Sequence, residues 1–530
     1  MENNVKKRHP RALDPGILIV NIITSVLGVI IGMELIVRIG ISTNTSIIGA
    51  LVAILISYIP LKIFQPFKSI YAQNMIQTNI SGATFSAANS MLLPIGIPYV
   101  IGRPDLVTPM LIGVILATIV DGTLIYKCFD TEMFPASDPW PPGIATAETI
   151  LAIKNKGKDA VLLLVGAIGG VIGKMLGIPT DLFGVSWIGD MWALGAFGVG
   201  ALFIGIVPKM TNIDFQSIYL PHGIMIGAGL VALIQVIVAL TKKEEERGGT
   251  SAAGRFTTSM ESMRKSLGGG FIAYIVIAIL IALMGGLMSD MSPLKLIVWI
   301  VFAAFAAIAS ELIVGMAAMH SGWFPGFATA LIFLIIGMLM GFPPMALALL
   351  VGYTAATGPA FADMGYDLKA GWILRGRGED PEFEVEGRKQ QYIAEVISFV
   401  IAGIMVALLH NNYFSQGLFA PVNHTYKVTI EAGASPEVAK YLIMFAIPGA
   451  IIQFVGGPAK QLGVLFATGL LVGNTLTGVT VLVALAIRGV LVRSKGETAQ
   501  TVLYVLGAGF ITGSALYSFF TSTLQLAKKS

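Results

Sequence analysis

Apolar residues occur in long runs from one end of the chain to the other. The first run extends from Ile17 to Ile36, and the next from Ile47 to Ile59. A helix that crosses the hydrocarbon core of a bilayer needs about 20 such residues. Counting the runs at that length, together with broken or re-entrant helices, predicts roughly 14 to 16 transmembrane helices. We therefore predict an all-α polytopic membrane protein that is embedded in a lipid bilayer.

Three polar segments interrupt this pattern and indicate how the chain is oriented. Residues 242–266 hold six Lys or Arg, residues 375–390 hold four, and residues 411–440 hold two. Cytoplasmic loops carry an excess of Lys and Arg. The pattern predicts that the N-terminus and the first two segments are cytoplasmic, that 411–440 is external, and that the protein lies in the inner (cytoplasmic) membrane. We divide the chain into an N-terminal transmembrane half (1–241), a cytoplasmic loop (242–266) and a C-terminal transmembrane half (267–530).

One eight-residue motif occurs twice. It reads WPPGIATA at 140–147 and WFPGFATA at 323–330, so that six of eight positions are identical at an offset of 183 residues. Two unrelated helix starts would be the simpler explanation, because proline is common there, but the number of identities favours duplication. We predict two broken or re-entrant helices, related by pseudo-symmetry, in duplicated halves.

The repeated motif also suggests where a solute binds. Proline and glycine interrupt a helix and expose the N–H groups that open the next one, which favour anions such as a carboxylate. A repeated helix break at membrane depth is typical of a transporter's binding site. The candidate solute-binding residues from the two copies are Pro142, Gly143, Thr146, Gly326 and Thr329.

A polar arc occupies the segment 65–102, which is otherwise rich in apolar residues. Helical spacing places Asn74, Gln77, Thr78 and Ser81 on one face. Their amides and hydroxyls offer donors and acceptors to a polar solute, although the same residue types also mediate packing between membrane helices. We predict that these four residues line an aqueous central cavity and bind the solute.

Ionisable residues inside apolar runs are costly in a membrane and usually functional. Glu148 follows the first Pro-Gly break by about one and a half turns, and it is the first candidate for a proton-coupling group. The alternative is that it is solvated near the aqueous end of its helix. Glu311 and Asp121 lie deepest in their runs, and His320, which precedes the second break, titrates near neutral pH. These three are the further candidates.

Asp363 and Asp367 are four residues apart and therefore share a helix face. The charged segment begins at Arg375, only eight residues later. We therefore expect both acids at the cytoplasmic boundary.

Composition excludes several classes of function. Charged residues make up 12% of the 530 residues, about half the fraction in soluble domains. Cys128 is the only cysteine, which excludes an intramolecular disulfide and a cysteine metal cluster. The net charge of +4 is spread over loops, so we expect no nucleic-acid partner. No nucleotide-binding, zinc-hydrolase or serine-hydrolase motif occurs, and we expect neither a cofactor nor a resident metal.

Four stretches together resemble the oligopeptide transporter family, which includes peptide transporters and yellow-stripe-like metal-chelate transporters. They are NMIQT at 74–78, PPGIATA at 141–147, DLKAGW at 367–372 and the pair Gln390-Gln391. The chain is similar to a prokaryotic-type member, since its loops are short and the Asn-Pro-Gly motif of the eukaryotic peptide branch is absent. The resemblance implies solute–proton symport by roughly 16 spans built from duplicated hairpins.

We therefore predict a secondary active transporter, rather than an enzyme, that imports a small peptide or a metal-chelate together with protons. An uncoupled solute facilitator is the alternative within transport. A polytopic membrane enzyme is the alternative from another class, but it would need clustered catalytic groups, and the five histidines are scattered. The sequence leaves a homodimer open.

Overall fold

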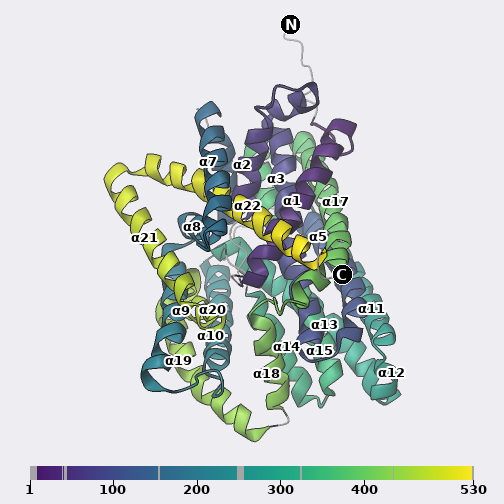
Figure 1. Cartoon of the computed structure of the whole chain (residues 1–530). Helices are drawn as coiled ribbons and strands as arrows, with labels where there is room; N and C mark the ends of the chain where they lie inside the picture. The colour runs from purple at the N-terminus through teal and green to yellow at the C-terminus, as the bar shows by residue number, and fades with distance from the viewer. Residues whose placement is uncertain are drawn as a thin grey trace.

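The computed structural model describes residues 9–38, 40, 45–152, 156–246, 256–322, 325–433 and 435–527. Helices form nearly all of this part of the chain, and it contains no strand. Within the described residues, eleven helical segments are long and apolar enough to cross a membrane, and four shorter apolar helices accompany them. The prediction of an all-α polytopic membrane protein is confirmed, with a mixture of full spans and shorter helices (Figure 1).

Two interrupted spans form the centre of the molecule. One runs through α3 (Ile70–Phe85), a π-helical segment η2 (Ser86–Leu92) and α4 (Leu93–Val100). The other consists of α15 (Pro344–Ala356) and α16 (Pro359–Leu374), which are separated by a break. These two spans are the most enclosed and the richest in polar residues. Both properties have one cause, because a helix that faces protein rather than lipid tolerates polar side chains.

Longer, more apolar helices surround this centre. Next to α3 lie α1 (Pro15–Arg38) and α17 (Pro381–Phe414), while α5 (Val107–Cys128) packs against α16 and α17. Farther out, α11 (Met260–Met284) and α13 (Pro293–Ser321) expose many large apolar side chains. Such exposed apolar surface is what a lipid-facing helix requires.

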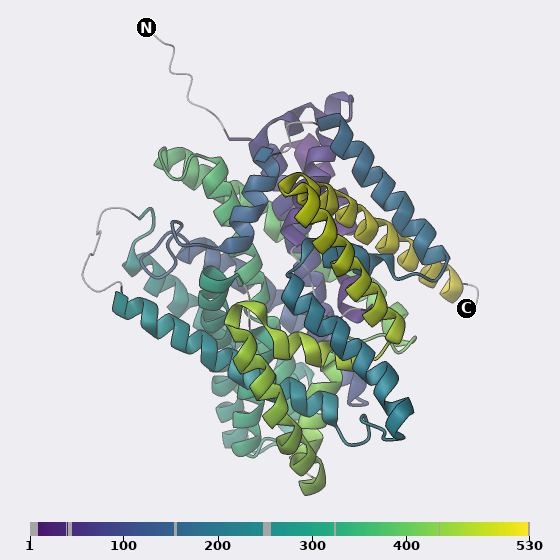
Figure 2. The same ribbon diagram turned by 90° about the vertical axis from the view of Figure 1, so that its left-hand side faces the viewer.

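Helices from the two predicted halves pack against each other in pairs. In one pair, α10 (Leu220–Glu246) lies on α19 (Pro436–Lys460), and in another α7 (Lys156–Met175) lies on α22 (Glu497–Ala527). Figure 2 shows the yellow α22 running beside the blue α7. A Cβ on Gly227 of α10 would lie 1.8 Å from the carbonyl oxygen of Ala446. Small residues thus bring the backbones into contact, as in other membrane proteins, and the division into two halves is not a division into separate bodies.

The charged segments lie where the predicted orientation requires. The 34 residues of α17 extend about 50 Å, well beyond the roughly 30 Å of a bilayer core. This helix therefore carries segment 375–390 to one end of the molecule and segment 411–440 to the other, where α18 (Val422–Ala432) lies (Figure 1). Arg388 donates to the Thr257 hydroxyl at 2.7 Å, which places the described end of segment 242–266 beside segment 375–390. That this side is cytoplasmic stays a prediction.

Large parts of the polar segments are helical rather than loops. Residues up to Glu246 continue α10, those from Met260 begin α11, and those from Pro381 begin α17. The reason is that Lys, Glu and Arg are good helix formers. Charge thus marks where these helices leave the membrane and not where they end.

The N-terminal segment is fixed by a buried histidine. The His9 ring contacts the rings of Tyr71 and Phe383, with centroids 5.6 Å and 5.5 Å away. Its side chain is largely buried, and burial lowers the pKa of His9 from 6.5 to about 4. A buried ring of this kind remains neutral at physiological pH, because charging it would require solvation that the site does not provide.

We expect this ring to make stability depend on pH. The unfolded chain binds a proton at His9 below pH 6.5, whereas the folded chain does so only near pH 4. Stability is therefore fully present above pH 6.5 and falls as the pH drops towards 4, by up to about 3 kcal/mol. Thermal unfolding in detergent should show this loss, and His9→Phe should reduce it while keeping the ring contacts. Parallel pH curves for the two proteins would contradict the assignment.

Candidate functional site

The first copy of the repeated motif contacts the end of α13 (Pro293–Ser321), the helix that precedes the second copy. In the first copy, α6 (Pro141–Ala152) begins one residue before the shared proline, Pro142, and in the second, α14 (Gly326–Leu339) begins one residue after its counterpart, Pro325. The backbone N–H of Trp140 donates to the carbonyl of Met319 at 2.8 Å, four residues before the second copy begins. Both segments are thus short helices that start at a break. Trp323 and Phe324 of the second copy lie outside the described residues, and the predicted pseudo-symmetry stays a prediction.

The threonines of the two copies make the same local bond. The Thr146 hydroxyl donates to the carbonyl of Pro142 at 2.8 Å, and the Thr329 hydroxyl donates to that of Pro325 at 3.3 Å. These partners occupy equivalent positions in the motif. Both threonines are buried, and Thr329 also lies 3.0 Å from the Ser310 hydroxyl. Their hydroxyls therefore stabilise the first helical turn in both copies.

Glycines let the first copy pack directly on α16. A Cβ on Gly143 would lie 2.4 Å from the carbonyl oxygen of Tyr366, and one on Gly365 would lie 2.2 Å from the Trp140 ring. The Trp140 indole is fully buried and donates to the carbonyl of Pro135 at 3.2 Å. Of the predicted solute-binding residues, Gly143 thus lies in a helix–helix contact; a role in solute binding stays a prediction for it and for Pro142.

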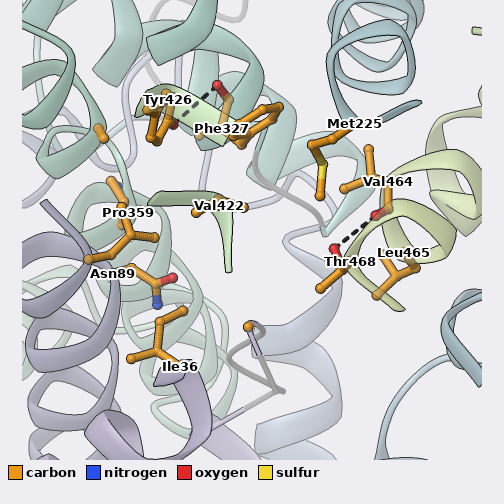
Figure 3. A pocket seen from close by; sticks show the side chains of 14 residues that line it. Ile36, Asn89, Met225, Phe327, Pro359, Val422, Tyr426, Val464, Leu465 and Thr468 are labelled. Carbon is orange, nitrogen blue, oxygen red and sulfur yellow. Dashed lines mark hydrogen bonds between the residues drawn. The ribbon is translucent and has the colours of Figure 1, made fainter. Parts of the chain in front are cut away.

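A small cavity of 160 Å³ lies where several helix breaks converge. Gly326 at the start of α14 and Pro359 at the start of α16 line it, together with Asn89 from the π-helical segment. Figure 3 shows Tyr426 and Thr468 on other sides of the same space. Most of the remaining wall is apolar. The N-terminus of α14 at its border provides an environment that favours an anionic group, whereas the first N–H groups of α16 are already accepted by Asp121.

A larger cavity of 580 Å³ lies on the other face of α18. Val422 and Tyr426 line the small cavity, whereas His424 and Lys427 line the large one. Arg38 also borders the large cavity. Glu431, which pairs with Lys427, lines the large cavity as well, so its polar wall carries charges of both signs. The helix α18 contributes side chains to both cavities and lies between them.

The polar arc on α3 faces α16 and α17. Gln77 Nε2 donates to Asp367 Oδ1 at 2.5 Å, and the Ser81 hydroxyl donates to Asp363 Oδ1 at 2.8 Å. The predicted shared face is thus present. However, these side chains are buried among acids of α16 and line neither of the two cavities.

The other two members of the arc, Asn74 and Thr78, also form hydrogen bonds with buried side chains. Asn74 Nδ2 donates to Gln77 Oε1 at 2.8 Å, and Gln391 Nε2 donates to the Thr78 hydroxyl at 2.9 Å. A role of the arc in solute binding stays a prediction.

Three carboxylates gather beside this arc. Asp363, Asp367 and Glu395 each offer an oxygen within 4.8 Å of the others, and all three are buried. The two aspartates therefore lie in the protein interior rather than at the boundary that we expected from the nearby charges. Sequence reasoning did not single out Glu395, although it is the only acid in the apolar part of α17.

A second acidic pair lies at the break between α15 and α16. Asp121 accepts the backbone N–H of Gly358 at 2.8 Å and that of Phe361 at 3.2 Å, so it satisfies the first N–H groups of α16. The Tyr274 hydroxyl lies 2.7 Å from Glu311 Oε2 and 3.3 Å from Asp121 Oδ1. Two of the predicted proton-coupling residues are thus joined through one phenol.

The other two candidates lie elsewhere. Glu148 is exposed on α6 rather than enclosed by neighbouring helices. His320 lies in the last turn of α13, and its side chain is outside the described residues. Glu148 lies close to a helix break in the sequence, but this position did not make it a buried residue.

Comparison with known proteins agrees with the resemblance noted above. Residues 217–525 match the family model described as OPT oligopeptide transporter protein. This match covers more than half of the chain and includes α14, α16, α17 and α18. No curated protein matches the chain.

The contact between Trp140 and α16 predicts a steric effect. Gly365→Ala should destabilise the protein by about 1–3 kcal/mol, because the new methyl group would overlap the buried indole. Gly269→Ala in α11 is the matched control, since a Cβ there would meet nothing within 4 Å. Thermal midpoints in detergent should fall only for Gly365→Ala. Equal midpoints would show that the indole can move aside.

The positions of the cavities predict which residues are accessible to water. In a background with Cys128 replaced by alanine, cysteine at His424 should react rapidly with a polar thiol reagent, and cysteine at Thr468 more slowly. Cysteine at Ser81 should be protected, because that hydroxyl is enclosed by α16. Labelling at Ser81 as fast as at His424 would instead support the aqueous cavity along α3 that the sequence predicts.

Proposed function

The chain belongs to the OPT oligopeptide transporter family, and from this we propose that it is a secondary active transporter that imports a small peptide or a metal-chelate by proton symport. One observation carries the coupling part of the proposal. Asp121 holds the first N–H groups of α16, and Pro359 at that same helix start lines the small cavity. A change in the protonation of Asp121 therefore affects the start of α16, which forms part of the wall of the small cavity.

The two cavities suit a solute with carboxylate groups. Arg38 and Lys427 line the large cavity and are paired with Glu34 and Glu431, so the cavity presents charges of both signs, as a zwitterionic solute such as a peptide does. Its 580 Å³ lies within the roughly 300–1,000 Å³ of small-molecule sites, whereas the 160 Å³ of the small cavity lies below it. We infer that the solute first binds in the large cavity. Movement of α18 then admits its carboxylate to the N-terminus of α14, which borders the small cavity.

Asp121 and Glu311 supply the proton-binding element of this scheme. A tyrosine hydroxyl has one proton to donate, yet Tyr274 lies within hydrogen-bond distance of both acids. Its single proton cannot satisfy two carboxylates at once, and a proton held by the pair completes the network. A protonated Asp121 is a weaker acceptor for Gly358 and Phe361, so protonation loosens the start of α16. Solute binding at that wall and proton binding are then linked.

The alternatives differ in measurable ways. An uncoupled facilitator would equilibrate the solute without responding to a proton gradient. A membrane enzyme would convert the solute without moving it across the bilayer. The acids described above support coupling over both alternatives, because they are buried at a helix break that borders a cavity rather than arranged around an exposed nucleophile.

We expect Asp121→Asn to abolish gradient-driven accumulation while leaving counterflow exchange largely intact. The amide keeps the size of the side chain but cannot exchange a proton. Proteoliposomes would first be screened with labelled di- to tetrapeptides and iron chelates, and the transported solute would then be followed with and without an inward proton gradient. Accumulation should fall at least tenfold, and Glu311→Gln should have the same effect.

Glu148→Gln is the matched comparison, because Glu148 is the first candidate from the sequence. Its exposed position leads us to expect accumulation close to that of the unaltered protein. Loss of accumulation in Glu148→Gln alone would return the coupling role to that residue. If Asp121→Asn, Glu311→Gln and Glu148→Gln all accumulated the solute normally, proton coupling at the Asp121–Glu311 pair and at Glu148 would both be contradicted.

A further inference from the structure

We propose that Asp363, Asp367 and Glu395 form a binding site for a hard divalent cation between α3, α16 and α17. This site is separate from the Asp121–Glu311 pair, and the transport scheme above does not depend on it. Neither the family match nor the repeated motif assigns a role to these three acids.

The spacing of the three acids fits a cation of this kind. One oxygen from each lies within 4.8 Å of the others. Calcium binds oxygen at about 2.3–2.6 Å, so ligands on opposite sides of the ion are about 4.6–5.2 Å apart. The three acids are therefore close enough together to share one such ion after small adjustments of their side chains. The ligand set is entirely oxygen, which favours a hard ion such as Ca²⁺ or Mn²⁺ over zinc or copper.

Several oxygens of the three acids have no hydrogen-bond partner among the described residues. They are both carboxylate oxygens of Glu395, together with Asp363 Oδ2 and Asp367 Oδ2. Each of these side chains is at most 2% exposed. A buried carboxylate oxygen without a partner is costly, and a cation placed between the acids would satisfy one oxygen of each from a single position.

The remaining oxygens hold the two aspartates in place. Asp363 Oδ1 accepts from Ser81, and Asp367 Oδ1 accepts from Gln77 and, at 3.1 Å, from Ser46. In metal sites, such outer hydrogen bonds commonly fix the orientation of the ligands. The polar arc of α3 therefore gains a specific role, which is to hold the acids while their second oxygens are free for the ion.

No basic side chain neutralises the three acids in the described part of the chain. Lys369, on the same helix, donates to the carbonyl of Ala136 at 2.7 Å and lies over the Trp372 ring. Arg375 is paired with Glu384 at 2.7 Å. Three uncompensated carboxylates in a protein interior require neutralisation. A divalent cation would neutralise two of the three negative charges.

The site also lies on the same helix as the small cavity. Pro359 lines that cavity, and Asp363 and Asp367 follow it at intervals of four residues, on one face of α16. The first acid is thus about 6 Å further along the helix than the cavity wall. A cation at this position would fix α16 to α17 next to the solute site.

The test is direct cation binding to the purified full-length chain in detergent, after EDTA treatment, at pH 7.5. Mn²⁺ would be titrated and its free concentration followed by electron paramagnetic resonance, with Ca²⁺ as competitor. We expect one site per chain that Asp363→Asn and Glu395→Gln each weaken at least tenfold. Ca²⁺ or Mn²⁺ should also raise the thermal midpoint of the unaltered protein but not that of the variants.

Glu34→Gln is the control, because Glu34 is a buried acid of α1 that pairs with Arg38 and lies outside the cluster. It should bind Mn²⁺ as the unaltered protein does. Glu395→Asp keeps the charge and should retain weakened binding, which separates ligand loss from misfolding. The proposal would be overturned if the unaltered protein bound no Mn²⁺, or if its Mn²⁺ binding persisted unchanged in Asp363→Asn and Glu395→Gln. So would a rise in thermal midpoint in Glu395→Gln without any change in Mn²⁺ binding, since it would show that protons alone neutralise the acids.

Discussion

The architecture depends on how one break in a buried span is satisfied. Backbone N–H groups inside a membrane protein must find partners within the protein, because no water is present at lipid depth. Between α15 and α16 the chain turns at Gly358, whose φ of +102° suits glycine alone, and the N–H groups that follow are accepted by the Asp121 carboxylate. The break thus exists only together with a buried acid from another helix. That acid in turn brings Tyr274 and Glu311 into the same network.

Glycine determines how closely the helices approach, and it does so across the whole length of the chain. The contacts of α10 with α19 and of α7 with α22 rest on positions where even one methyl group would overlap backbone atoms. Within a bilayer, apolar side chains gain little from leaving lipid, so close backbone packing takes over much of the stabilising role. The high glycine content is therefore a packing feature, and it explains how two halves of one sequence become interleaved.

Sequence patterns predicted the local features well and the tertiary ones poorly. Runs of apolar residues identified the helices, and the repeated Pro-Gly motif identified two helix starts, because both depend on nearby residues alone. The polar residues of α3 also share one face, as their spacing predicted, although their role in solute binding stays a prediction. Their hydrogen-bond partners, however, come from α16 and α17, about 300 residues away in the sequence. Residue spacing within one segment cannot predict such a long-range contact. Asp363 was misplaced for the same reason, since closeness to Arg375 in sequence is not closeness to water.

The hydrogen bond from Trp140 to Met319 has a consequence for the history of the chain. It joins the first residue of one motif copy to the end of α13, four residues before the other copy, through backbone atoms alone. If the copies arose by duplication, the first copy now rests on the helix that leads into the second. A substitution that shifts the start of α6 or the end of α13 displaces one partner of this bond. The two copies are then free to exchange side chains, but selection must act on their backbone geometry as a single inherited unit.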